Sequence, residues 1–170
     1  YKEGVFSGSQ DEPIYGDTYL PRKFKVAVTV PGDNSVDLLT QDIGLVLFTN
    51  KNGTMRGCNV YVGGGLGRTH NQDDTFARIA DPLGYVDAED IFDLLQSIMA
   101  LQRDHGDREV RKHARMKYLL HKRGIEWFRE TLIKDYFKRD IKNLIHESPA
   151  KLMDYLGWYR QKPGLWFVGL

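Results

Sequence analysis

The alternation of apolar and polar residues predicts three strands in the first part of the chain. The first covers residues 23–30, after a break at Pro21, and its two faces carry Phe24, Val26, Val28 and Val30 on one side and Lys23, Lys25, Ala27 and Thr29 on the other. Strands are also predicted at 43–49 and 55–62, because the Asn-Gly pair between them is typical of a hairpin turn.

Apolar residues at helical spacing predict three helices in the second half of the chain. The first covers residues 88–104 and follows Asp87, which is a suitable N-cap with further acidic residues behind it. The second and third cover residues 108–122 and 125–138, on either side of Gly124. The apolar stripe of the third helix indicates core packing rather than a cofactor site.

The other segments are predicted to be connections or short elements: an extended lead-in over 1–19, a short helix or irregular connector over 35–42, a turn at 82–85, and a connector over 139–154 with short helices around 141–145 and 149–154. A turn at 161–164 then precedes the apolar run 165–170, which predicts a final strand.

The composition is typical of a globular chain of about one domain. Its 170 residues are 41% hydrophobic, and the net charge of +1 gives no global reason to expect a nucleic acid or a membrane surface as partner. The single cysteine, Cys58, excludes an internal disulfide and any cysteine-only metal or iron–sulfur site made by this chain alone. No apolar run spans a bilayer and residues 1–10 contain no signal-peptide core, so we expect a soluble protein in a reducing compartment.

Two groups of basic residues stand out against this neutral total. Lys23 and Lys25 share one strand face, directly after Arg22. In the predicted helix 108–122, a second group at i, i+3, i+4 and i+7 shares one helix face: Arg108, Arg111, Lys112 and Arg115. Each group alone fits a solvated surface, and lysines also protect edge strands from aggregation. Together, two groups of one sign imply a polyanionic partner.

A run of glycines follows the third strand. Gly63, Gly64 and Gly65 carry no Cβ, so a flat or anionic ligand could approach the main chain and take its N–H groups. The spacing matches neither a dinucleotide fingerprint nor a P-loop. A flexible loop is the alternative interpretation, and the nearby Arg68 and His70 favour ligand contact.

Four stretches resemble the assimilatory sulfite reductase haemoproteins, especially the ferredoxin-dependent enzymes of plants and cyanobacteria. These are Thr18–Lys25, Asn59–His70, Leu101–Asp104 and Asp107–Tyr118. The similarity is collinear from about residue 12 to residue 170. It implies an α+β fold, with helices packed on a mixed or antiparallel sheet.

The resemblance also implies cofactors and site residues. In that family a sirohaem with eight carboxylates is coupled to a [4Fe–4S] cluster, and sulfite is reduced by six electrons to sulfide with electrons from ferredoxin or a flavoprotein. Lys23 and Lys25 match the lysines that face the substrate. The positions that match sirohaem contacts are Arg22, Asn59, Gly63, Gly64, Gly65, Arg111, Arg115 and Lys117.

One pair of positions separates sulfite from nitrite in this family. The nitrite-reducing relatives carry asparagine at the position of Lys25 and an aromatic residue at that of Gly65, so this chain resembles the sulfite enzymes. Nitrite reductase is the first alternative, and a non-enzymatic module that binds nucleic acid or another polyanion is the second. No aromatic residues interleave the basic helix, which counts against the second.

The chain also departs from the family. The four cluster cysteines are missing, and Cys58 lies where the family has an apolar residue. We therefore expect an internal piece of a larger enzyme, which binds no cluster and is inactive alone. Its expected parts are the lead-in over 1–19, a sirohaem-facing half-domain over 20–154, and the truncated first strand of a following half-domain over 155–170. Cytoplasm or plastid stroma is the expected location.

Overall fold

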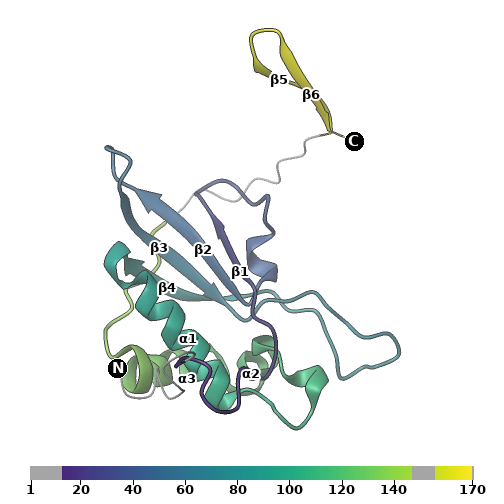
Figure 1. Cartoon of the computed structure of the whole chain (residues 1–170), viewed down its shortest axis with the longest axis vertical. Helices are drawn as coiled ribbons and strands as arrows, with labels where there is room; N and C mark the ends of the chain where they lie inside the picture. Colours follow the sequence, from purple (N-terminus) through teal and green to yellow (C-terminus); the bar gives the residue numbers. More distant parts are fainter. Residues whose placement is uncertain (1–12, 147–155, 170) are drawn as a thin grey trace.

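The computed structural model describes residues 13–146 and 156–169. A four-stranded sheet in the order β1-β2-β3-β4 forms its centre, and helices pack against it (Figure 1). The strands are β1 (Val26–Thr29), β2 (Ile43–Thr49), β3 (Met55–Val62) and β4 (Asp81–Asp87). β1 pairs with β2 in parallel and the other pairs are antiparallel, so the predicted mixed sheet is confirmed.

The helical layer follows the sheet in sequence. It consists of the short 3₁₀ turn η2 (Ala88–Asp90), α1 (Ile91–His105), the 3₁₀ turn η3 (Arg111–His113), α2 (Met116–Arg123), α3 (Ile125–Thr131) and the π-helical turn η4 (Leu132–Phe137). Another 3₁₀ turn, η1 (Leu38–Thr40), connects β1 to β2. Among the residues described, no helix combines the length and apolar character needed to cross a membrane.

Alternating residues of the central strands form one side of the core. Leu45, Cys58 and Val60 are buried against Ile98 and Phe128 from the helices. Because strand side chains alternate, this face of the sheet is apolar and the helices bury it. The α+β class predicted from the sequence is confirmed.

The edge strand β1 differs from its prediction. It begins at Val26 rather than at residue 23, and Val26 and Val28 are each 47% exposed, whereas Thr29 is buried. β1 pairs with a neighbour on one side only, and its partners in the fold are β2 and η1. The valine face therefore lies outside the core, which is centred on β2 and β3.

Residues 82–85 form part of β4 and not the predicted turn. Pro82 pairs with Tyr61 next to a register shift in β3, a position where proline is tolerated. Gly84 has a φ of +144°, and a Cβ there would meet Ile141 and Lys142, which cross over the strand. The predicted turn is wrong: Pro82 and Gly84 lie in a strand, at a register shift in its pairing with β3.

The predicted helix 108–122 is wrong in its first half. The Asp107 side chain accepts hydrogen bonds from the N–H groups of Glu109 and Val110, at 2.9 and 2.8 Å, and this turn competes with a helix. Regular helix begins only at Met116. The four basic residues assigned to one helix face therefore do not share one, and Arg108 instead donates to the carbonyls of Thr18 and Tyr19.

The other predicted elements are close to those observed. η2 and α1 cover the helix predicted at 88–104, and α3 with η4 cover the helix predicted at 125–138. η1 is the short helix foreseen within 35–42. Residues 141–145 carry no helix, and the segments 1–12 and 149–154 lie outside the described residues.

The end of the chain contains two strands where one was expected. β5 (Gly157–Lys162) pairs with β6 (Leu165–Gly169) in an antiparallel hairpin, and Tyr159 stacks on Phe167. The expected turn at 161–164 is the connection of this hairpin. The assignment of residues 155–170 to a following half-domain stays a prediction.

The glycine run after β3 generates a test of packing. A Cβ at Gly64 would overlap the carbonyl oxygen of Leu39 and lie 2.7 Å from that of Gln41, whereas a Cβ at Gly67 meets nothing within 4 Å. We expect Gly64→Ala to lower the free energy of unfolding by about 1–3 kcal/mol, because two backbones must separate. Urea unfolding of this variant beside Gly67→Ala tests it; equal stabilities would contradict the packing role.

Candidate functional site: a cationic hollow

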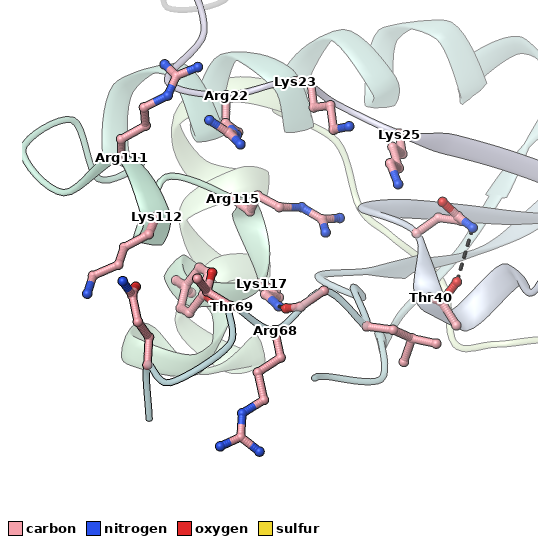
Figure 2. Close-up of a pocket in the computed structure, with 15 residues that line it drawn as sticks. Arg22, Lys23, Lys25, Thr40, Arg68, Thr69, Arg111, Lys112, Arg115 and Lys117 are labelled. Carbon is pink, nitrogen blue, oxygen red and sulfur yellow. Dashed lines mark hydrogen bonds between the residues drawn. The ribbon is translucent and has the colours of Figure 1, made fainter. Parts of the chain in front are cut away.

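A hollow of about 690 Å³ lies where four segments of the chain meet: Thr40 and Gln41 at the end of η1 contribute to its lining, and three longer segments form its walls. Residues 22–25 before β1 form one wall, residues 66–72 after the glycine run form a second, and residues 111–118 from η3 and α2 form a third. Figure 2 shows Lys25 and Arg115 extending into the same space from two different segments, whereas the Arg68 side chain extends away from them.

Every charged side chain that lines the hollow is basic: Arg22, Lys23, Lys25, Arg68, Arg111, Lys112, Arg115 and Lys117. In Figure 2, Lys23 and Lys25 point from above toward the Arg115 guanidinium. The first basic group and three members of the second, Arg111, Lys112 and Arg115, thus meet at one site although they are about ninety positions apart in the sequence, whereas Arg108 does not line the hollow. Like charges at this density repel one another and attract anions.

The cations of the upper rim have no ionic partner in the described part of the chain. The side chains of Arg22, Lys23, Lys25 and Arg111 form no hydrogen bond or ion pair within it. Lys23 and Lys25 are exposed, so water solvates their ammonium groups. An anion that enters the hollow meets donors that no internal acceptor occupies.

Arg115 is different, because a buried carboxylate holds it. Its Nη2 donates to both carboxylate oxygens of Asp42 at 3.1 Å and lies 3.4 Å from the Gly64 carbonyl oxygen. Asp42 is 1% exposed, and burial raises the pKa of its carboxyl while the Arg115 charge acts against this. Nη1 of Arg115 has no hydrogen-bond partner among the described residues.

Lys117 is buried beneath the floor of the hollow. Its Nζ donates to the carbonyls of Gly65 at 3.2 Å, Gly67 at 2.7 Å and Phe76, and only 1% of the residue is exposed. Burial lowers the pKa of this ammonium, and the charge of Arg115 adds to the effect. All three N–H donors serve the loop after β3, so Lys117 shapes the hollow from inside.

Two acidic residues of the loop after β3 pair with cations that line the hollow. Asp74 accepts from Lys112 at 2.7 Å and lies 3.1 Å from the His113 Nε2, and this lowers the pKa of its carboxyl. Asp73 pairs with Arg68 at 3.1 Å, but both side chains are largely exposed and contribute little stability. Arg68 therefore remains accessible to a ligand.

The glycine run has a different role from the one predicted. The amides of Gly63, Gly64 and Gly65 donate to the carbonyls of Asp42, Gln41 and Arg78, at 2.9, 3.0 and 2.8 Å. The prediction that a ligand takes these N–H groups is wrong, because the chain itself uses them. A Cβ at Gly65 would lie 2.8 Å from a guanidinium nitrogen of Arg115, so the glycine leaves room for that side chain.

Asn59 lies away from the hollow. It is fully buried in β3, where its amide donates to the Ile145 carbonyl at 2.8 Å and its oxygen accepts from the Ile145 N–H at 3.0 Å. These two bonds fix the segment after η4 against the sheet. His70 likewise does not line the hollow. The cofactor contact assigned to Asn59 stays a prediction.

The residues described here supply no metal centre. Cys58 is fully buried in the core, and burial raises its pKa from 9.0 to about 12. Within the described ranges, no three His, Cys, Asp or Glu side chains come together in a way that could hold a metal ion. The exclusion of Cys58 as a cluster ligand therefore agrees with its position.

Asp42 is the residue beside the hollow that the sequence interpretation did not single out, although it contacts both Lys25 and Arg115. It was assigned to the connector 35–42, and its partner Arg115 is 73 positions away. One signal was present: an acid directly before the buried strand at Ile43 places a carboxylate at the edge of the core. Such an acid requires a cationic or N–H partner.

The contribution of the three hydrogen bonds from Lys117 can be tested by removing its ammonium group. Lys117→Met leaves the carbonyls of Gly65, Gly67 and Phe76 without this donor, and of these the Gly65 carbonyl is buried. We therefore expect the free energy of unfolding to fall by about 1–3 kcal/mol. The matched control is Lys122→Met, an exposed lysine on the same helix. Urea unfolding measures both, and equal stabilities would show that the ammonium is dispensable.

The buried thiol generates a prediction for alkaline pH. Because the folded pKa of Cys58 is raised, the unfolded chain loses this proton near pH 9 while the folded chain keeps it. Stability is therefore lost as pH rises: from pH 8 to pH 10 the wild-type free energy of unfolding should fall by about 1.4 kcal/mol relative to Cys58→Ala. Urea titrations at both pH values measure this, and parallel curves would contradict it.

Comparison with known proteins identifies the family of this chain. Residues 8–141 match the family model of the nitrite and sulphite reductase 4Fe-4S domain. The chain is 58% identical over 159 residues to the ferredoxin sulfite reductase of Synechococcus elongatus, covering 94% of this chain and 25% of that protein. It is 45% identical to the NADPH sulfite reductase subunit beta of Saccharomyces cerevisiae over 158 residues, covering 91% of this chain and 11% of that protein.

A solved structure agrees with these matches. The NirA protein of Mycobacterium tuberculosis is 30% identical and superposes with a TM-score of 0.68, over 88% of this chain and 26% of that protein. The chain thus spans about a quarter of the length of the cyanobacterial relative and of NirA. Sequence and fold together place this chain in the nitrite and sulphite reductase 4Fe-4S domain family.

Proposed function

We propose that this chain is the part of a sulfite reductase that binds the carboxylates of sirohaem and the sulfite anion. The observation that carries the proposal is the set of rim cations without ionic partners, which converge on the hollow with Arg115. The relatives named above are sulfite reductases, one dependent on ferredoxin and one on NADPH. The enzyme as a whole would reduce sulfite to sulfide in a six-electron reaction.

The residues present fit the carboxylates of such a tetrapyrrole. A buried carboxylate requires a cation or an N–H donor, and the rim offers Arg22 and Arg111 as bidentate donors beside the lysines. Arg115 adds Nη1, and Arg68 and Lys112 extend the positive surface outward. When bound, sirohaem would supply the iron at which sulfite is reduced.

The chain's own groups would orient the anion and move protons. The Nζ atoms of Lys23 and Lys25 are donors on the same wall, so they can hold sulfite oxygens, and each can release a proton as oxygen leaves as water. Buried Lys117 is less suited to this role, because three carbonyls occupy its donors.

The described residues do not fit a [4Fe–4S] cluster. Four ligands are required, and the buried Cys58 is neither accessible nor accompanied by other ligands within these ranges. We infer that the cluster and the contact with ferredoxin or a flavoprotein belong to other parts of a longer enzyme. The isolated chain is then inactive as a reductase.

The space around position 65 supports sulfite rather than nitrite as substrate. In the family that this sequence resembles, the nitrite-reducing members carry an aromatic residue at this position. Any side chain at position 65 would clash with the Arg115 guanidinium. Glycine keeps that guanidinium in the hollow, and Lys25 adds a second cation. Sulfite at neutral pH carries more charge than nitrite, so additional cations favour it.

Binding of a polycarboxylate to the chain tests the proposal. Uroporphyrin, which carries eight carboxylates, should bind saturably and shift its absorption band. Lys23→Ala/Lys25→Ala should raise its Kd about tenfold, because two exposed cations each contribute up to about 1 kcal/mol. Spectroscopic titration at low salt measures the Kd.

The control for this titration is Lys51→Ala, an exposed lysine in the turn between β2 and β3. It should leave the Kd unchanged. Equal loss of affinity in both variants would indicate attraction by total charge alone. A chain that ignores uroporphyrin but binds duplex DNA with a steep salt dependence would overturn the proposal in favour of nucleic-acid binding.

A further inference from the structure

We propose that Asp42 is a positioning residue, which fixes Lys25 and Arg115 relative to each other across the hollow. The inference rests on the proposed function, because it assigns to Asp42 the arrangement of the anion-binding cations. Asp42 itself does not line the hollow. It acts from behind the wall, through two residues that do.

The first contact fixes the wall that carries the lysines. The main-chain N–H of Lys25 donates to Oδ2 of Asp42 at 3.0 Å. The next residue, Ile43, donates its N–H to the Lys25 carbonyl at 3.0 Å. Lys25 is therefore held by both of its main-chain polar groups to the start of β2, and the direction of its side chain follows from this.

The second contact fixes the opposite wall. Nη2 of Arg115 reaches both carboxylate oxygens of Asp42, while the Arg115 side chain is 15% exposed. Because Nη2 is anchored, Nη1 remains available to the hollow. One carboxylate thereby connects residues 25 and 115, which no secondary-structure element joins.

The third contact ties the glycine run to the same point. The main-chain carbonyl of Asp42 accepts from the N–H of Gly63 at 2.9 Å. Asp42 is thus bound through its side chain to two walls of the hollow, and through its main chain to the glycine run that precedes the third wall. The main-chain bond survives any substitution at this position, which allows the side-chain contribution to be isolated.

Asparagine cannot reproduce the side-chain contacts. It has one acceptor oxygen where aspartate has two, and its NH₂ group would face a donor of Lys25 or Arg115. An amide oxygen in the place of Oδ2 could still accept from both residues, but the amide nitrogen would then replace Oδ1 and face Nη2 of Arg115. Arg115 therefore loses one acceptor and its charged partner, and the Lys25 N–H keeps only a neutral acceptor. The substitution also removes a negative charge from beneath a cationic site, which by itself would strengthen anion binding.

These two effects have opposite signs, so the experiment distinguishes them. If Asp42 positions the cations, Asp42→Asn should raise the Kd for uroporphyrin about tenfold in the folded chain, despite the gain in positive charge. If Asp42 only balances charge, the Kd should fall. Binding is measured well below the unfolding temperature, with far-UV circular dichroism to verify folding.

A readout without ligand keeps the inference separate from the proposed function. Amide hydrogen exchange at Lys25 should become at least tenfold faster in Asp42→Asn, and the Arg115 guanidinium signals should shift in the nuclear magnetic resonance spectrum. Failure of the wild-type chain to bind uroporphyrin would refute the proposed function while these signals still decide the role of Asp42. Unchanged exchange at Lys25 and unshifted Arg115 signals would overturn the inference.

The matched control is Asp37→Asn in the same connector. Asp37 is exposed, has no side-chain hydrogen bond among the described residues, and has a φ of 48° that asparagine also adopts. It should leave the exchange of Lys25, the Arg115 signals and the Kd unchanged. A response equal to that of Asp42→Asn would assign the effect to overall charge and overturn the inference.

Discussion

The repulsion among cations collected in one hollow is the constraint on which the rest of this structure depends. Bringing the groups around Lys25 and Arg115 together is unfavourable in the empty chain. The fold reduces this cost by pairing the most buried cations internally: Lys117 donates to three carbonyls and Nη2 of Arg115 to Asp42, although Nε of Arg115 is buried without a partner among the described residues. Only the cations of the rim keep their charge unpaired, and water solvates them until an anion arrives.

This division explains why the buried cations of the hollow are paired within the chain, whereas the unpaired ones are exposed to solvent. A buried charge without a partner is costly, whereas an exposed one costs little. Lys117 and Arg115 differ from Lys23 and Lys25 mainly in depth. The deep cations define the shape of the hollow, and the shallow ones provide its affinity.

The sequence predicted the sheet and the main helices because hydrophobic periodicity reports burial directly. The strand at 55–62 and the helix that begins near Ile91 follow from it. The failures arose where a side chain replaces regular hydrogen bonding, as at Asp107, or where a proline occupies a bulge, as at Pro82. Such competition depends on tertiary neighbours, which periodicity does not contain.

For the site, too, the sequence indicates which residues come together but not how their polar groups are paired. Residue types and family resemblance pointed to Lys23, Lys25 and Arg115, which the structure places around one hollow, but they do not show which cations lack an internal partner. The glycines illustrate the reason: their N–H groups are occupied by Asp42, Gln41 and Arg78, so their lack of side chains serves close packing of the backbone. A nitrogen can donate to a ligand only if the fold leaves it unpaired, and the hydrogen bonds of Asp42 occupy Nη2 of Arg115 and the N–H of Lys25 while leaving Nη1 of Arg115 unoccupied among the described residues.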